Sequence, residues 1–223
     1  AREGQVGANS FQTNGVLLDD KWCEFFKDNN FLIGLSLDGP QELHDKYRFD
    51  KGKRPTHAKV EAALKLLQKH GVDYNVLCCV SKANAERPLD VYRYFRTMGV
   101  KKIQFIPVVN EGEVPGQATE ESVTGIQYGN FLISVFDEWY ANDMGSMYVF
   151  LFEHFAARLQ GGNAGLCVFE PTCGLALALE HTGDLYACDH YVSPEYLLGN
   201  IFETNIAELV NTRQQYDFGV KKA

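Results

Sequence analysis

The sequence predicts an α/β protein built around a parallel sheet. Three short segments, residues 31–37, 72–80 and 103–109, are as rich in apolar residues as strands that are buried on both faces. Helical patterns separate these segments, and one further strand–helix unit precedes them. Because crossovers between parallel strands are right-handed, this β-α-β-α-β-α-β series predicts either a doubly wound sheet or an arc of a barrel.

The first unit combines a strand at Asn9–Thr13 with a helix that Asp19 or Asp20 can cap. The next helix can begin with Thr56 as its cap and end at Gly71, and a third is expected near residues 89–98. The apolar residues that these helices carry include Trp22, Phe25, Phe26, Val60, Ala63, Leu64 and Leu67.

Four strands cannot close a barrel, and the first begins almost at residue 1. We therefore expect a missing upstream part and an unpaired apolar sheet edge, with either association of the chain through that edge or a shifted local structure. Polar residues follow two of the strands, at 13–15 and 36–39. Ligand contacts in α/β enzymes gather at such carboxyl ends.

The second half of the chain changes character. Residues 111–125 are polar and rich in Gly and Glu, which predicts a long loop, and helical patterns at 128–139 and 150–159 are expected to cover the sheet. Residues 175–180 and 185–188 then flank a turn and predict a β-hairpin. A last helix is expected from near Thr204, with Ile206, Leu209 and Val210 facing inward.

Composition narrows the classes of function. The 223 residues contain no apolar run long enough to span a membrane and no basic-then-apolar leader at the N-terminus. A net charge of −8 disfavours nucleic acid as a partner, because phosphate binding uses clustered Lys and Arg. Six cysteines without a secretory signal indicate a reduced cytoplasmic setting.

Three cysteines form the densest group of possible metal ligands. Cys167, Cys173 and Cys188 lie within 22 residues of one another, and His190 follows closely. Such thiolates suit an iron–sulfur cluster, a Cys3His zinc site or plain burial, and their spacing leaves all three open. The adjacent Cys78 and Cys79 must point to opposite faces of a strand and are expected to be buried small hydrophobes.

A polar group follows the second strand. This group consists of Ser36, Asp38 and Arg48 and could hold a ligand's carboxylate and hydroxyls, with Arg48 as a bidentate hydrogen-bond donor. Alternatively, Ser36 and Asp38 end the strand in a turn and Arg48 is a solvated charge. The histidines at 44, 57 and 70 have no metal-ligand spacing and are expected at the surface.

Four segments resemble the anaerobic sulfatase-maturating enzymes. They are NSFQTNGVLLDDKW (9–22), GLSLDGPQELHDKYR (34–48), IQFIPVV (103–109) and PTCGLALALEHTGDLYACDHYVSPEYLLGNI (171–201). The resemblance covers nearly the whole chain. It implies the radical S-adenosylmethionine (radical SAM) fold, a partial (βα)6 TIM-type barrel followed by a SPASM domain that holds auxiliary 4Fe-4S clusters.

The resemblance also implies a function as an oxidoreductase. In that family a cluster on a CxxxCxxC motif cleaves S-adenosylmethionine, and the 5'-deoxyadenosyl radical takes hydrogen from Cβ of a sulfatase Cys or Ser, giving Cα-formylglycine. The family's adenosylmethionine contacts correspond to Ser36, Arg48 and Val109, its auxiliary-cluster ligands to Cys167, Cys173 and Cys188, and its catalytic base to Asp189. The expected partner is a sulfatase polypeptide.

The sequence departs from the family at two places. It has no CxxxCxxC, and it ends before the family's cysteine-rich tail. We therefore expect a partial barrel in residues 1–112, a loop with covering helices in 113–165, and a partial SPASM domain in 166–223. The chain as a whole is expected to be inactive by itself and to hold the family's cofactors incompletely or not at all. The alternative is a non-catalytic module that binds a peptide or structural zinc.

Overall fold

The structure, a computed structural model, describes residues 7–110, 112, 117–162 and 165–221. The chain forms two compact units, residues 1–152 and 153–223, each of which is described by itself. The domain boundaries expected at 112 and 165 stay predictions.

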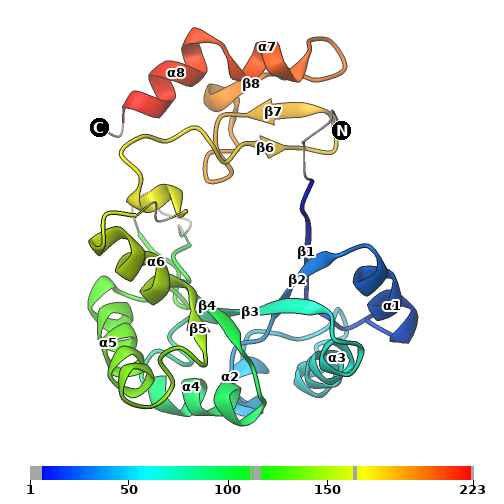
Figure 1. The fold of residues 1–223 in the computed structure, drawn as a ribbon, viewed down its shortest axis with the longest axis vertical. Helices are drawn as coiled ribbons and strands as arrows, with labels where there is room; N and C mark the ends of the chain where they lie inside the picture. The colour runs from blue at the N-terminus through cyan, green and yellow to red at the C-terminus, as the bar shows by residue number, and fades with distance from the viewer. Residues whose placement is uncertain (1–6, 111, 113–116, 163–164, 222–223) are drawn as a thin grey trace. The chain divides into compact units, whose positions relative to one another are not determined.

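The first unit contains a five-stranded parallel sheet in the order β1-β2-β3-β4-β5. The strands are β1 (Asn9–Thr13), β2 (Phe31–Ser36), β3 (Asp73–Val80), β4 (Lys102–Pro107) and β5 (Tyr148–Val149). Figure 1 shows these strands on the inner side of an arc and the long helices of the unit on its outer side. The predicted α/β fold with a parallel sheet is thus confirmed. The sequence did not predict β5, a two-residue strand that pairs with β4 at the edge of the sheet.

The helices of this unit are α1 (Asp20–Asp28), α2 (Gln41–His44), α3 (His57–His70), α4 (Pro88–Thr97), α5 (Gly125–Asn142) and α6 (Phe150–Leu159), the last of which crosses the unit boundary. Asp19 caps α1 by accepting the backbone N–H of Trp22 at 2.9 Å. Gly71 ends α3 in the left-handed conformation, with φ +61°, where a side chain would be strained. Both ends agree with the sequence prediction.

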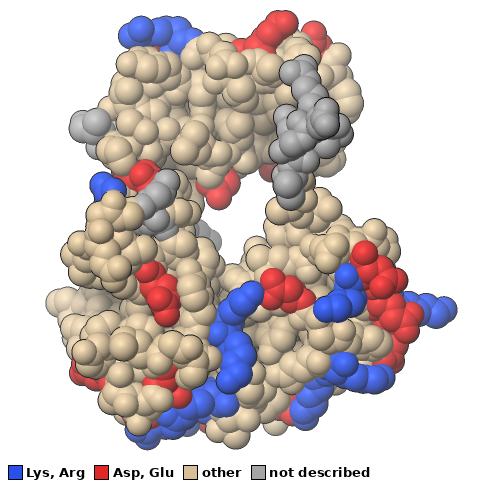
Figure 2. Space-filling model, viewed as in Figure 1, with Lys and Arg blue, Asp and Glu red and all other residues tan. Residues whose placement is uncertain are grey.

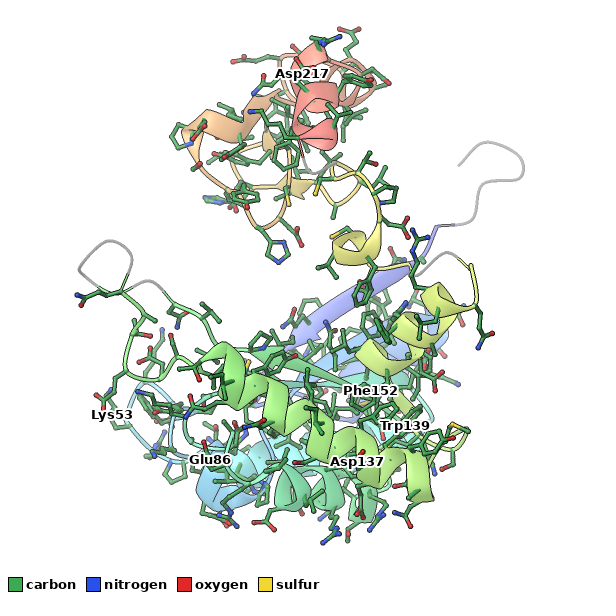
Figure 3. The ribbon with its side chains drawn as sticks, turned by 90° about the vertical axis from the view of Figure 1, so that its left-hand side faces the viewer. Lys53, Glu86, Asp137, Trp139, Phe152 and Asp217 are labelled. Carbon is green, nitrogen blue, oxygen red and sulfur yellow. The ribbon has the colours of Figure 1, made fainter. Side chains whose placement is uncertain are left out.

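The core lies between the sheet and the helices. β2 and β3 contribute the fully buried Ile33, Leu35, Val76 and Cys78, and α3 contributes Leu64 and Leu67. In the same core cluster, Trp139 of α5 and Phe152 of α6 lie against each other, with ring centroids 5.4 Å apart (Figure 3). The Trp139 indole N–H donates to the carbonyl of Met147 at 2.7 Å, which fixes the turn between α5 and β5.

The edge strand β1 pairs only with β2 among the described strands, and its residues are mostly exposed. Association through this edge stays a prediction. Acidic and basic side chains are interspersed over the helices of the first unit on the face that Figure 2 shows. Among the described residues, none of the helices has the length and apolar character that crossing a bilayer requires.

The second unit is built on a small antiparallel sheet in the order β6-β7-β8. The predicted hairpin is present as β6 (Ala178–Leu179) and β7 (Asp184–Tyr186), and β8 (Leu197–Asn200) adds a third strand. The short helices η1 (Cys167–Phe169) and η2 (Pro194–Tyr196), then α7 (Ile206–Val210) and α8 (Arg213–Val220), complete the unit. The inward orientation expected for Ile206 is wrong: Ile206 is 48% exposed, because the five-residue α7 turns only Leu209 into the small core.

Candidate functional site

The first unit gathers polar side chains at the carboxyl ends of β2, β3 and β4. Strand register brings them together, because Ser36 pairs with Leu77 and the backbone N–H of Leu37 donates to the carbonyl of Leu77 at 3.1 Å. Asp38 therefore lies beside Cys79, whose N–H donates to Asp38 Oδ1 at 2.8 Å. The turn that follows β2 and the end of β3 form one corner of the site.

Arg48 is anchored in this corner. Its Nε donates to Asp38 Oδ2, and its Nη2 donates to Asp38 Oδ1 at 3.2 Å and contacts Cys79 Sγ at 3.3 Å. Burial opposes the charge of Arg48, but the hydrogen bonds and charge of Asp38 prevail and raise the pKa of the guanidinium. Arg48 is therefore not the solvated surface charge of the alternative interpretation; it is a fixed cation with donors left for a ligand.

Two cavities share Tyr47 and Arg48. The larger, of about 320 Å³, is lined by Asp38, Tyr47, Arg48, Cys79, Ser81, Val108, Asn110 and Glu121. The smaller, of about 200 Å³, is lined by Asn14, Val16, Ser36, His44, Tyr47, Arg48, Phe49, Thr56 and Val60. The guanidinium thus borders space that a small polar molecule can occupy.

The predicted adenosylmethionine contacts are only partly brought together. Ser36 is buried and lines the smaller cavity, and Arg48 lines both. Val109 is 68% exposed, and its neighbours Val108 and Asn110 are the residues that line the larger cavity. The segment is held in place by the N–H of Val108, which donates to the carbonyl of Val80 at 2.8 Å.

Cys79 was missed as a site residue. Cys78 is fully buried, as expected, but Cys79 on the opposite face of β3 is half-buried and borders the larger cavity. Burial raises the pKa of the Cys79 thiol, and the charge of Asp38 adds to this effect, so the thiol form is favoured at neutral pH. The alternation of side chains along β3 was the available signal, since two adjacent cysteines point to opposite faces of the sheet and only one of them can share the face of Val76 and Val80.

The structure corrects the predicted surface positions of two histidines, His44 and His57. His44 is fully buried and His57 is 5% exposed, so the expectation of surface positions is wrong for both. His44 Nδ1 accepts the backbone N–H of Asp38 at 3.2 Å, which leaves its Nε2–H to donate to Thr56 Oγ1 at 3.2 Å. The Thr56 hydroxyl in turn donates to the carbonyl of Arg48 at 2.9 Å. Through this chain of hydrogen bonds a neutral imidazole braces the loop that carries Arg48.

The start of α3 differs in detail from the prediction. Thr56 occupies the cap position, but it makes no side-chain capping bond because its hydroxyl is used by Arg48 and His44. Asp45 caps the helix instead: its Oδ1 accepts the backbone N–H groups of Thr56 at 3.0 Å and His57 at 2.9 Å.

The second unit carries the predicted cysteine ligands. Cys188 is buried, and its Sγ accepts the N–H of His190 and lies 3.5 Å from Asp189 Oδ1. The ligand-type atoms of Cys188, Asp189 and His190 lie within 4.8 Å of one another, whereas Cys167 and Cys173 do not join this group. Burial raises the pKa of the Cys188 thiol, and the charges of Asp189 and Cys167 raise it further.

Asp189, the predicted base, is accessible. Its side chain is 55% exposed, and its Oδ1 lies 3.0 Å from His190 Nδ1. The carboxylate thus combines a fixed neighbour with an open side from which a substrate could approach.

Comparisons with known proteins agree with these two units. Residues 167–223 match the SPASM family, described as an iron-sulfur cluster-binding domain. The chain is 42% identical to the serine-type anaerobic sulfatase-maturating enzyme of Bacteroides thetaiotaomicron, over 98% of this chain and 56% of that enzyme. It is 35% identical to the cysteine-type enzyme of Clostridium novyi, over 94% of this chain and 56% of that enzyme.

A solved structure has the same fold. Native anSMEcpe with bound AdoMet superposes with a TM-score of 0.86 and 34% identity, over 96% of this chain and 59% of that protein. Another structure of native anSMEcpe, with a TM-score of 0.86, contains bound AdoMet and the Kp18Cys peptide. The partial radical SAM barrel and the SPASM assignment are confirmed. By sequence and by fold, the chain belongs with the anaerobic sulfatase-maturating enzymes, of whose length it spans a little over half.

Proposed function

We propose that this chain carries part of a radical S-adenosylmethionine enzyme that matures a sulfatase by oxidising one of its Cys or Ser residues to Cα-formylglycine. The observation that carries the proposal is the guanidinium of Arg48, which Asp38 holds at the border of two cavities beyond the carboxyl ends of the strands. The similarity to both serine-type and cysteine-type enzymes supports the reaction class and leaves the target residue open.

Arg48 would bind the carboxylate of adenosylmethionine. Its Nε and one Nη2 proton are used by Asp38, so Nη1 remains to form charge-assisted hydrogen bonds with the ligand. Ser36, in the wall of the smaller cavity, would donate or accept a further hydrogen bond, and Val109 would contact the ligand beside the larger cavity.

Cys167, Cys173 and Cys188 would hold an auxiliary iron–sulfur cluster. The donors fit, because three thiols lie in one compact unit. Thiolate sulfur is the donor that iron–sulfur clusters use, although the three sulfur atoms do not form a group within 4.8 Å of one another. Clusters and adenosylmethionine would supply the oxidising chemistry, and Asp189 would take the proton from the target side chain.

These 223 residues lack the CxxxCxxC motif, so we expect them to bind adenosylmethionine without cleaving it. The test is calorimetric titration of the chain with adenosylmethionine and with 5'-methylthioadenosine, which lacks the carboxylate. Arg48→Ala should weaken adenosylmethionine binding by about 10- to 100-fold and leave methylthioadenosine nearly unaffected. The control is Arg54→Ala, which removes an exposed arginine paired with Asp50 outside both cavities.

Equal losses for the two ligands, or an equal loss in Arg54→Ala, would contradict the assignment of Arg48. Iron and sulfide analysis after anaerobic reconstitution tests the second unit. Zinc with no iron would favour the alternative of a non-catalytic zinc module.

A further inference from the structure

Gln215 lies on α8 and contacts the two cysteine-bearing segments from one side. The side chain is almost completely buried, with the residue 5% exposed. Its backbone N–H donates to the capping hydroxyl of Thr212 at 3.3 Å, which fixes the residue in the first turn of the helix. Its side-chain Nε2 donates to two carbonyls, that of Gly174 at 2.8 Å and that of Ala187 at 3.3 Å.

Those two carbonyls belong to the immediate neighbours of Cys173 and Cys188. A single amide group therefore ties together two segments that are 13 residues apart along the chain. Both of its donor hydrogens are used, one for each segment.

The backbone of α8 holds the same region. The carbonyl of Gly219 accepts the N–H of Cys173 at 3.0 Å, and a Cβ at position 219 would lie 2.9 Å from the Cys173 carbonyl oxygen. The absence of a side chain there lets the helix approach this closely. Gln215, Gly219 and Cys173 also line one cavity of about 300 Å³.

The side-chain oxygen of Gln215 is not hydrogen-bonded in the way that its nitrogen is. Its Oε1 is buried and has no hydrogen-bond partner among the described residues. An unpaired buried carbonyl is unfavourable, and a leucine of similar size would fill the same space without it. What the glutamine provides, and leucine does not, is the pair of N–H donors to the two cysteine segments.

We propose that Gln215 is a positioning residue for the cysteine site, which pre-arranges Cys173 and Cys188 for cluster binding by holding the backbone beside each of them. The proposal rests on the assignment of an iron–sulfur cluster to this unit. Holding the ligand segments before the cluster binds lowers the entropy lost when it does.

The test compares Gln215→Leu with Gln214→Leu in the full chain. Gln214 is an exposed neighbour on the same helix whose amide donates to the carbonyl of Leu197 at 3.0 Å, so the control loses a side-chain hydrogen bond that does not involve the cysteine segments. The first readout is the iodoacetamide labelling rate of each cysteine in the metal-free chain, measured by peptide mass spectrometry. The second is iron and sulfide per chain after anaerobic reconstitution.

We expect Gln215→Leu to label about fivefold faster at Cys173 and Cys188, with Cys23 of α1 unchanged as an internal reference, because the segments open locally. Iron content should fall by more than about half. Gln214→Leu should match the parent in both. If Gln215→Leu does not fold by circular dichroism, Gln215→Met provides the same comparison, since methionine has about the size of glutamine and no N–H donor.

Labelling and iron content equal to the parent in a folded Gln215 variant would overturn the proposal. A parent chain that takes up no iron would mean that these 223 residues hold no cluster, an outcome that the incomplete ligand set allows. The labelling rates would still decide whether Gln215 holds the two segments.

Discussion

Asp38 accepts hydrogen bonds from Arg48 with both carboxylate oxygens. Its Oδ1 accepts Arg48 Nη2 at 3.2 Å and also the backbone N–H of Cys79 at 2.8 Å. One carboxylate thus joins the end of β2, the end of β3 and the arginine that follows α2. The side-chain amide of Asn84 supports the same corner by donating to the carbonyls of Asp38 at 3.3 Å and Cys79 at 2.8 Å.

The first prediction concerns this carboxylate. Asp38→Asn should lower the affinity for adenosylmethionine by about 10-fold or more, because the amide has one acceptor oxygen in place of two and no charge, and so holds the guanidinium less firmly. Calorimetry measures the affinity. Asp50→Asn is the control, since Asp50 also pairs with an arginine but lies outside both cavities. A comparable loss in both variants would mean that the Asp38–Arg48 pair has no special role in binding.

The second prediction concerns Cys79. Saturating adenosylmethionine should slow maleimide labelling of Cys79 by about tenfold, because the thiol borders the cavity beside Arg48. Labelling should speed up toward alkaline pH, since the thiol pKa is raised. Fully buried Cys78 should stay unlabelled with and without the ligand. Unchanged labelling of Cys79 would place the ligand elsewhere.

The third prediction is a pH dependence. Burial lowers the pKa of His44 from 6.5 to about 4. The unfolded chain therefore binds more protons than the folded chain between these values, so the free energy of unfolding should fall as pH drops from 6.5 to 4. The loss should reach roughly 3 kcal/mol at most. Urea denaturation at several pH values between 6.5 and 4 gives the free energy of unfolding at each pH. This free energy should fall less steeply with falling pH in His44→Asn than in the parent. His181→Asn, at a position whose side chain is 90% exposed, should keep the parent slope.

The fourth prediction concerns the cap of α3. Asp45→Ala should destabilise the chain by about 1–2 kcal/mol, because the backbone N–H groups of Thr56 and His57 lose their acceptor. Urea denaturation measures the change. Asp73→Ala, which removes only an exposed ion pair with Lys102, should cost no more than about 1 kcal/mol. If the two variants are equally stable, Asp45 is not the cap.

Periodicity along the chain was sufficient for most elements. The strand at Asn9–Thr13 and the helix at Phe150–Leu159 agree with the prediction at both ends. Such elements are set by apolar patterns and by local caps such as Asp19 and Gly71. The strands β5 and β8 were missed, because each consists of only a few residues and exists through pairing with a neighbour.

The sequence by itself determined the α/β class, the order of the strands and helices, and, through resemblance, the candidate residues Ser36, Arg48, Val109 and the three C-terminal cysteines. Only the tertiary structure decided that His44 is buried and hydrogen-bonded to Asp38, that Cys79 borders the cavity beside Arg48 and that Gln215 links two cysteine segments. The physical reason is the range of the interactions. Most helices and the longer strands follow from patterns among residues a few positions apart. The short strands β5 and β8 and the contacts of His44, Cys79 and Gln215 depend instead on strand pairing and helix packing between residues far apart in the sequence.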